Sequence, residues 1–331
     1  MIELSAIVAA LASPHATGGV LVTLVSAEGS SYRRPGARLL IGPSGYRIGS
    51  ISGGCLEEDV LARSRKVQAT GIAEAVVYDT TSENDLVWGV GLGCHGVVRV
   101  LLEKVSPRVA WAQALAENLR RRRPTDLTVV HGIDTVEKWG TRLAAPGDCT
   151  DPERLFADRI EPPPALTILG AGDDAQPLAR LAKELGWHVT VGDPRAALAT
   201  AQRFPLADRI ITAPADELAA AINVDRRTLV AVMTHHYVHD VPLLRALLPQ
   251  PLAYLGLLGP RKRAEKILGD LAAGGLTITP AMRDRLHAPI GLDLGADAPE
   301  QVALAMLAEM QAVLGGRDGR PLREREGPIH E

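Results

Sequence analysis

The second half of the chain alternates short apolar runs with helical patterns, and this alternation constrains the fold more than any other feature. The first run, 166–169, leads into Gly170-Ala-Gly172, and the helical pattern behind it closes at Gly186. Later strands are expected at 189–191, 210–211, 229–233 and 253–258, with helices at 216–222, 241–248, 262–273 and 299–314. Strands that alternate with helices predict βαβ units, so this half is expected to form a Rossmann-like, doubly wound parallel sheet.

The first half has a less regular pattern and predicts an α+β domain with glycine-rich turns. Expected helices cover 3–12, 55–70 and 107–120, and expected strands cover 20–26, 38–42, 46–51, 74–79, 97–103 and 127–131. The fold class is therefore α/β, with an N-terminal α+β domain ahead of the Rossmann-like domain.

A proline- and aspartate-rich stretch, 146–164, separates the two halves and ends in three consecutive prolines. Such a composition is typical of an interdomain linker. The expected organisation is an α+β domain at 1–148, a linker at 149–164, a Rossmann-like domain at 165–316 and a flexible tail at 317–331.

The composition narrows the classes of function. The net charge is −3, aromatic residues make up 3%, and there is no basic tail, which together argue against a nucleic-acid partner. The apolar run 6–12 is preceded by Glu3 and by no Lys or Arg, so it predicts a first helix rather than a signal peptide. No apolar run approaches the ~18–20 residues of a membrane span, so no membrane partner is expected. Three cysteines, an odd number, favour free thiols in a reducing cytoplasm, and they are Cys55, Cys94 and Cys149.

A strand that runs into Ser52-Gly53-Gly54-Cys55, with a helix behind it, is the strongest chemical feature of the first half. The stretch 29–55 contains four arginines and seven glycines but no acidic residue. Helix N-termini attract anions, and glycines let backbone N–H groups approach a phosphate. A thiol beside them adds a soft nucleophile or metal ligand. The alternative is a tight turn with a small buried cysteine.

A second glycine-rich segment, 89–96, places Cys94 and His95 beside Gly93. Four glycines in eight residues favour a loop that packs its backbone against a planar ligand. Adjacent Cys and His rarely bind one metal ion unaided, and the C-x-x-C pair typical of zinc sites is absent. Whether Cys94 faces the same pocket as Cys55 depends on the tertiary structure.

Gly170 and Gly172 begin a G-x-G-x-x-A motif between a strand and a helix, and Asp193 follows about 20 residues later. This is the dinucleotide-binding fingerprint in its expected context. Asp173 and Asp174 lie where a pyrophosphate would approach, and their charges would repel it. Because the two aspartates serve equally well as helix caps, the motif is compatible with a nucleotide-binding loop and with a purely structural loop.

His235 belongs to the segment 234–240, which follows the strand that ends at Met233. In an open α/β sheet this edge lines the ligand crevice. Three histidines and Asp240 in this segment suit proton transfer or a metal-dependent hydrolase. A polar loop with one or two buried histidines explains the pattern equally well.

Several long motifs, spread over nearly the whole chain, occur in the order that is typical of one protein family. They are EGSSYRRPGARLLI, GSISGGCLEEDV and GLGCHGVVRVLLE, then LTILGAGDDAQPLARLAKELGWHVTVGDPR, VMTHHYVHD and YLGLLGPRKRAEKIL. Through them the chain resembles the XdhC/CoxI family, accessory proteins of molybdenum hydroxylases such as xanthine dehydrogenase.

The resemblance implies a protein that binds the molybdenum cofactor, as molybdopterin or its dinucleotide form, rather than a turnover enzyme. It implies that the protein protects the cofactor, supports its sulfuration and inserts it into a xanthine dehydrogenase-type apo-hydroxylase. A cytoplasmic homodimer is expected, with a cysteine desulfurase as a further candidate partner. The alternative is an NAD(P)-dependent oxidoreductase that uses the Rossmann-like domain.

The same resemblance suggests which residues hold the cofactor. Cys55 is the expected contact to molybdenum or its sulfur, because a soft thiolate suits both. The phosphate is expected near Arg33, Arg34, Arg38 and Arg47, beside Ser52-Gly53-Gly54. The full set of expected cofactor residues is Arg33, Arg34, Arg38, Ser52, Gly53, Gly54, Cys55, Gly93, Cys94, Gly170, Gly172, Asp193 and His235.

Overall fold

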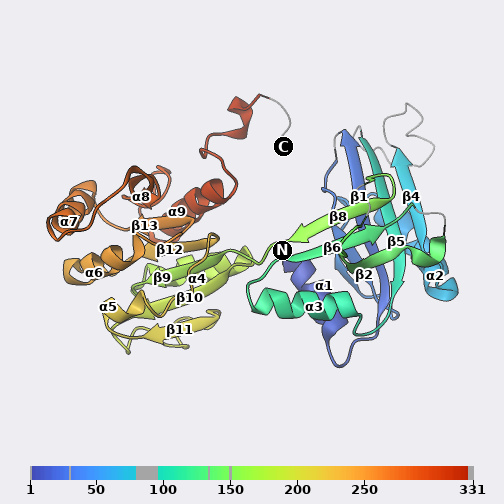
Figure 1. Cartoon of the computed structure of the whole chain (residues 1–331), viewed down its shortest axis with the longest axis horizontal. Helices are drawn as coiled ribbons and strands as arrows, with labels where there is room; N and C mark the ends of the chain where they lie inside the picture. The colour runs from blue at the N-terminus through green and yellow to red at the C-terminus, as the bar shows by residue number, and fades with distance from the viewer. Residues whose placement is uncertain (1, 30, 80–95, 133–134, 149–150, 327–331) are drawn as a thin grey trace. The chain divides into compact units, whose positions relative to one another are not determined.

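The computed structural model describes residues 2–29, 31–79, 96–132, 135–148 and 151–326. The chain divides into two compact units, Met1–Pro162 and Pro163–Glu331 (Figure 1). Each unit is described by itself. The predicted site residues Gly93 and Cys94 lie outside the described residues, as does Cys149.

The first unit is built on a five-stranded antiparallel sheet. Its strand order is β3 (Arg47–Gly49), β2 (Arg38–Ile41), β1 (Gly19–Gly29), β5 (Gly96–Val105) and β4 (Glu74–Asp79). The helices of this unit are α1 (Ile2–Ala12), α2 (Glu57–Thr70), α3 (Ala110–Arg120) and the short 3-10 helix η2 (Val136–Lys138). The predicted helix at 55–70 therefore begins two residues later than expected.

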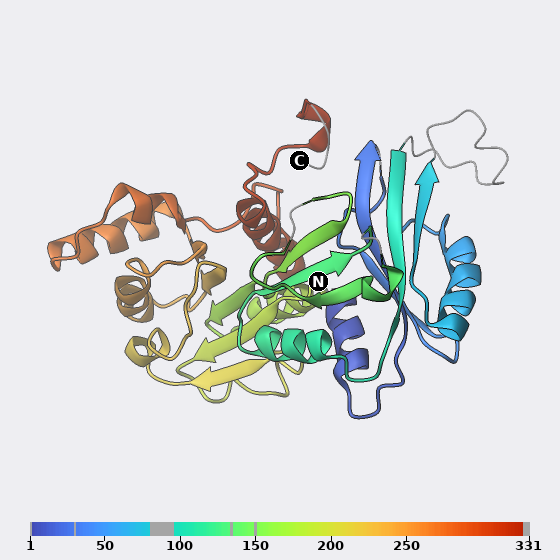
Figure 2. The same cartoon turned by 45° about the vertical axis from the view of Figure 1, so that its right-hand side comes forward.

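Helices cover both faces of this sheet, which explains why its central strand is apolar on both sides. Val20, Val22 and Leu24 of β1 share one buried cluster with the apolar face of α2. Leu21, which points the other way, belongs to a cluster with Trp111 and its neighbours on α1 and α3. Figure 2 shows α2 on one side of the sheet and α1 and α3 on the other.

A second, three-stranded antiparallel sheet completes the first unit, and two of its strands were not predicted. Its order is β7 (Gly140–Leu143), β6 (Thr125–Val130) and β8 (Leu155–Ile160). β8 lies inside the segment predicted to be a linker, yet it pairs with β6 along its whole length. Its middle is partly exposed and only Leu155 and Ile160 are buried, so the sequence carries little strand pattern there.

The second unit is the expected doubly wound parallel sheet. Its strand order is β11 (Arg209–Thr212), β10 (His188–Asp193), β9 (Ala165–Leu169), β12 (Thr228–Val232), β13 (Tyr254–Leu257) and β14 (Leu286–His287). The order reverses direction between β9 and β12, as in Rossmann folds.

Helices lie on both faces of the parallel sheet. One face packs against α4 (Ala175–Glu184) and α9 (Pro299–Leu314). The other face packs against α5 (Ala215–Leu218), α6 (Tyr237–Leu247) and α7 (Arg261–Ala273). The short elements α8 (Pro280–Asp284), β14 and η3 (Leu322–Glu324) were not predicted, because a few residues carry no readable periodicity.

The predicted strands and helices of this unit otherwise match the structure to within a few residues. The helix expected at 299–314 has those bounds in the structure. Among the described residues, none of the helices combines the length and the apolar character that crossing a bilayer requires.

Candidate functional site

The turn that precedes α2 is held by a carboxylate of the chain itself. Glu57 Oε1 accepts hydrogen bonds from the Ser52 N–H at 3.1 Å and from the Ser50 hydroxyl at 3.3 Å. Glu57 Oε2 accepts from the Leu56 N–H at 3.2 Å and also contacts the Ser52 hydroxyl. Part of the anion-binding capacity of this helix start is therefore used internally.

The environment keeps Glu57 ionised. Burial acts to raise its pKa, but the hydrogen bonds from Ser52 and Ser50 outweigh burial and hold the pKa below its ordinary value. Glu57 was not among the predicted site residues. The signal was present in the sequence as the acidic residues of the first helical turn, which stabilise a helix N-terminus.

Among the described residues, the space above Gly54 is open, whereas Gly53 is covered by the ring of Tyr32. Gly54 has a φ of 109°, which disfavours other residues, and a Cβ placed there would meet no atom within 4 Å. Gly53 lies against the ring of Tyr32, at 3.6 Å from the Cβ position, and that ring is 67% exposed. Among the described residues, no acceptor contacts the N–H groups of Gly53 and Cys55. These two donors are therefore available to a ligand or to solvent.

Cys55 is half-buried, between the core and this open turn. It packs against the cluster that contains Leu56 and Val60, and it is a free cysteine. The residue is therefore partly exposed on one side and in contact with the apolar core on the other. The predicted neighbour Cys94 lies outside the described residues, so a pocket that contains both thiols stays a prediction.

The arginines predicted to hold a phosphate have different partners and different burial in the structure. Arg33 forms an ion pair with Glu3 of α1 at 2.7 Å. Arg34 is exposed. Arg38 is only 3% exposed, with its Nη1 2.7 Å from Asp158 of β8. Because Arg38 is buried against an acidic partner, its placement does not allow the direct phosphate contact that the sequence suggested.

In the second unit the predicted residues do come together, at the carboxyl edge of the parallel sheet. Gly170 has a φ of 117°, and a Cβ there would lie 2.4 Å from the Met233 carbonyl oxygen. The tight contact between the β9–α4 turn and the end of β12 therefore requires glycine. Gly172 faces open space, with no atom of the described part of the chain within 4 Å of its Cβ position.

Asp193 ties this glycine-rich loop to the sheet and is fully buried. Its Oδ2 accepts the Ala171 N–H at 2.6 Å, and the Arg195 guanidinium binds both of its oxygens at 2.8–2.9 Å. Burial acts to raise the pKa of Asp193, but the Arg195 and backbone hydrogen bonds outweigh it and lower the pKa. The acid that would bind a ribose hydroxyl in a dinucleotide site is thus occupied by the protein.

The two aspartates of the same loop also have partners in the chain. Asp173 forms an ion pair with Arg203 at 2.8 Å, and this pair holds the pKa of Asp173 below its ordinary value. His235 Nε2 lies 3.5 Å from Asp174 Oδ2. His235 has a φ of 57°, an uncommon backbone state for a residue with a side chain.

The histidine segment after β12 does not form a metal centre in the described residues, where no group of three metal-ligating side chains occurs. Asp240 is 1% exposed and bonded to the Thr234 hydroxyl at 2.5 Å and to Arg263. A cleft of about 710 Å³ nearby is lined by Pro194, Asp216 and His239, among others.

Two protein-family patterns match the chain. The pattern described as the XdhC Rossmann domain matches residues 166–310, and that of the XdhC and CoxI family matches residues 15–79. The first covers the parallel sheet, and the second ends with β4 after spanning the turn at Cys55 and helix α2.

Similar proteins extend the match to most of the chain. A Bacillus subtilis (strain 168) protein named as a probable xanthine dehydrogenase subunit is 32% identical, over 88% of this chain and 92% of that one. The molybdenum cofactor insertion chaperone PaoD of Escherichia coli (strain K12) is 25% identical, over 89% of this chain and 83% of that one. A crystal structure described as a xanthine dehydrogenase from Bacillus halodurans has a TM-score of 0.81 and 28% identity, with 95% and 96% of the two chains covered.

Proposed function

The chain belongs to the XdhC and CoxI family, and from this premise we propose that it binds the molybdenum cofactor and delivers it to a molybdenum hydroxylase of the xanthine dehydrogenase type. The cofactor is cargo here, not a resident group. The observation that carries the proposal is the half-buried Cys55 in a turn where no acceptor among the described residues contacts the N–H groups of Gly53 and Cys55. A similar protein that is named a molybdenum cofactor insertion chaperone supports the same assignment.

The residues of the turn fit such a cargo. Cys55 offers a soft sulfur ligand, which suits molybdenum and its sulfur ligands. The N–H groups of Gly53 and Cys55 are donors without an acceptor among the described residues, and they suit an anionic or carbonyl oxygen of the cargo. Glu57 fixes the turn through Ser52 and Leu56, so these donors are held in place before the cargo arrives.

The finer steps belong to the same proposal. A thiol at the edge of an apolar cluster shields bound cargo on one side while its outer side stays reachable. This geometry is compatible with protection of the cofactor and with sulfuration by a cysteine desulfurase that approaches from solvent. We further propose that the protein acts in the cytoplasm as a homodimer.

Metal and pterin that copurify with the protein test the proposal directly. Protein is purified from a host that makes the cofactor, and molybdenum and oxidised-pterin fluorescence are measured per chain. Cys55→Ala is expected to lose about tenfold or more of both, because the soft ligand is gone. The matched control Cys149→Ala removes another thiol and is expected to keep both. A Cys55→Ala protein that retained molybdenum and pterin and still activated the apo-hydroxylase would overturn the assignment.

Calorimetric titration separates this proposal from the NAD(P)-dependent oxidoreductase alternative. Asp193 is buried and bonded to Arg195, so it is not available to a ribose hydroxyl, and Asp173 and Asp174 face Arg203 and His235 of the same unit. We therefore expect no heat on adding NADH or NADPH. Saturable heat with either nucleotide would favour the alternative.

A further inference from the structure

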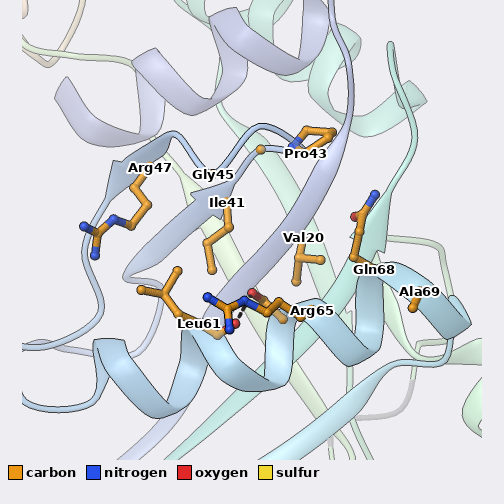
Figure 3. A pocket seen from close by; sticks show the side chains of 11 residues that line it. Val20, Ile41, Pro43, Gly45, Arg47, Leu61, Arg65, Gln68 and Ala69 are labelled. Carbon is orange, nitrogen blue, oxygen red and sulfur yellow. Dashed lines mark hydrogen bonds between the residues drawn. The ribbon is translucent and has the colours of Figure 1, made fainter.

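A cleft of about 460 Å³ lies between α2 and the β2–β3 hairpin of the first unit, at a different place from the turn at Cys55 (Figure 3). Its volume is in the range of pockets that hold small organic ligands. Residues from β1, the hairpin and α2 line it, and none of them is acidic. The cleft therefore has a single sign of charge.

Two arginines supply that charge, Arg47 from β3 and Arg65 from α2. Both are exposed, and neither has an ion-pair partner in the part of the chain that the structure describes. By contrast, Arg33, Arg38 and Arg63 of the same unit are all paired with carboxylates. In Figure 3 the guanidinium groups of Arg47 and Arg65 both lie toward the Leu61 end of the opening. Two unpaired guanidinium groups at one end of a cleft suit a phosphate.

The rest of the lining suits an uncharged ring system. The apolar side chains Val20, Ile41 and Leu61 line the cleft together with Ala69. Gln68 lies toward the end away from Arg47 (Figure 3), and its carboxamide oxygen is buried without a hydrogen-bond partner among the described residues. The acceptor capacity of this oxygen is therefore unused among the described residues, and it suits a ring N–H.

We propose that this cleft binds a small phosphorylated nitrogen heterocycle, with the phosphate on Arg47 and Arg65 and the ring on the apolar lining. The inference does not depend on the role of Cys55. Two sources share this chemistry: the phosphate-bearing pterin of the cargo, or a free phosphorylated metabolite.

Riboflavin 5′-phosphate and riboflavin form a matched pair of probes, because they differ only in the phosphate and their fluorescence reports binding. At low ionic strength the full chain is expected to bind riboflavin 5′-phosphate about tenfold or more tightly than riboflavin. Arg47→Gln and Arg65→Gln are each expected to weaken the phosphorylated probe about tenfold. Cys55→Ser is expected to leave both affinities unchanged, which separates this inference from the proposed function.

The control is Lys66→Gln, which removes a charge from the same helix outside the cleft, where Lys66 pairs with Glu74. Equal losses for Lys66→Gln and Arg65→Gln would show a general charge effect and overturn the inference. No binding of riboflavin 5′-phosphate, or equal binding of the two probes, would also overturn it. If the two arginine variants in addition lose copurified pterin, the ligand is the cargo; if they keep it, the ligand is a free phosphorylated metabolite.

Discussion

The turn before α2 and the loop before α4 have the same plan, since each is a glycine-rich connection at a helix start with a carboxylate bound to its backbone. In the first, Glu57 bonds the N–H groups of Ser52 and Leu56; in the second, Asp193 bonds the N–H of Ala171. The two connections differ in the polar groups that remain without a partner among the described residues. The α2 turn keeps donors that no acceptor of the described residues contacts, together with a half-exposed thiol.

The α4 loop, by contrast, has its acidic groups paired within the chain. Asp193 is fully buried against Arg195, Asp173 pairs with Arg203, and Asp174 faces His235. The α4 loop carries the more familiar motif, the dinucleotide-binding fingerprint, but the α2 turn has more groups that are available to bind a ligand. Asp193 is the buried group among these three, and a ligand that used its carboxylate would have to displace Arg195, which costs free energy.

The largest effect is expected where glycine is required by the backbone contact itself. Gly170→Ala places a Cβ against the Met233 carbonyl at a strained φ, and we expect it to lower the free energy of unfolding by ~4 kcal/mol. Urea denaturation measures this value. Gly172→Ala is the matched control, because its Cβ position is open and the change should stay within ~0.5 kcal/mol. Equal effects at the two positions would contradict the structure.

Asp193→Asn tests whether the Asp193 carboxylate holds the α4 loop against the sheet. The variant should lower the free energy of unfolding by ~2–3 kcal/mol at neutral pH. The pKa of Asp193 is lower in the folded than in the unfolded chain, so its contribution is present above the unfolded pKa. The contribution is lost as the pH falls through the folded pKa. The difference between wild type and variant should therefore shrink in acid. A difference that grows in acid would contradict the buried ion pair.

Glu57→Gln tests the same device in the α2 turn, with a smaller expected loss of about 1 kcal/mol, because Glu57 is partly solvated. Its pKa is also lowered on folding, so this stabilisation too should fade as the pH drops through the folded pKa. Denaturation at several pH values measures it. Glu58→Gln, one residue along at an exposed position, is the control and should change little.

Tyr32→Ala is expected to have the smallest effect on stability, within ~0.5 kcal/mol, because the ring is mostly exposed. It removes the ring that covers Gly53, so it separates stability from cargo retention at the open turn. Thermal unfolding and copurified pterin are measured together. A large loss of stability would show that Tyr32 is a structural residue of the first unit.

Most of the fold was predictable, because the periodicity of an element is local information. In the second unit the alternation of five predicted strands with helices is confirmed, and the helix at 299–314 has its expected bounds, but the strand order and the sixth strand β14 were not predicted. β8 was missed because only its two ends are buried, and its partner β6 is distant in the sequence. Pairing between distant segments leaves no local pattern of this kind.

The candidate site was predictable in its residue types but not in their partners. Ser52-Gly53-Gly54-Cys55 stands out in the sequence because glycines and a thiol meet at a helix start. The sequence does not show that Arg38 is already paired and so cannot bind a phosphate, since its partner Asp158 lies far along the chain, on the missed strand β8. The cleft with Arg47 and Arg65 was likewise invisible, because a hairpin and a helix form it together.

The sequence alone determined where strands and helices alternate, which is a property of neighbouring residues. The requirement for glycine at position 170 came from the tertiary structure, because a Cβ there would meet the Met233 carbonyl at the end of β12. Only the tertiary structure decided which charged groups are paired and which stay available. Arg33 meets Glu3, whereas Arg47 and Arg65 face a cleft, because Coulomb interactions depend on distances in space that the order of residues does not specify.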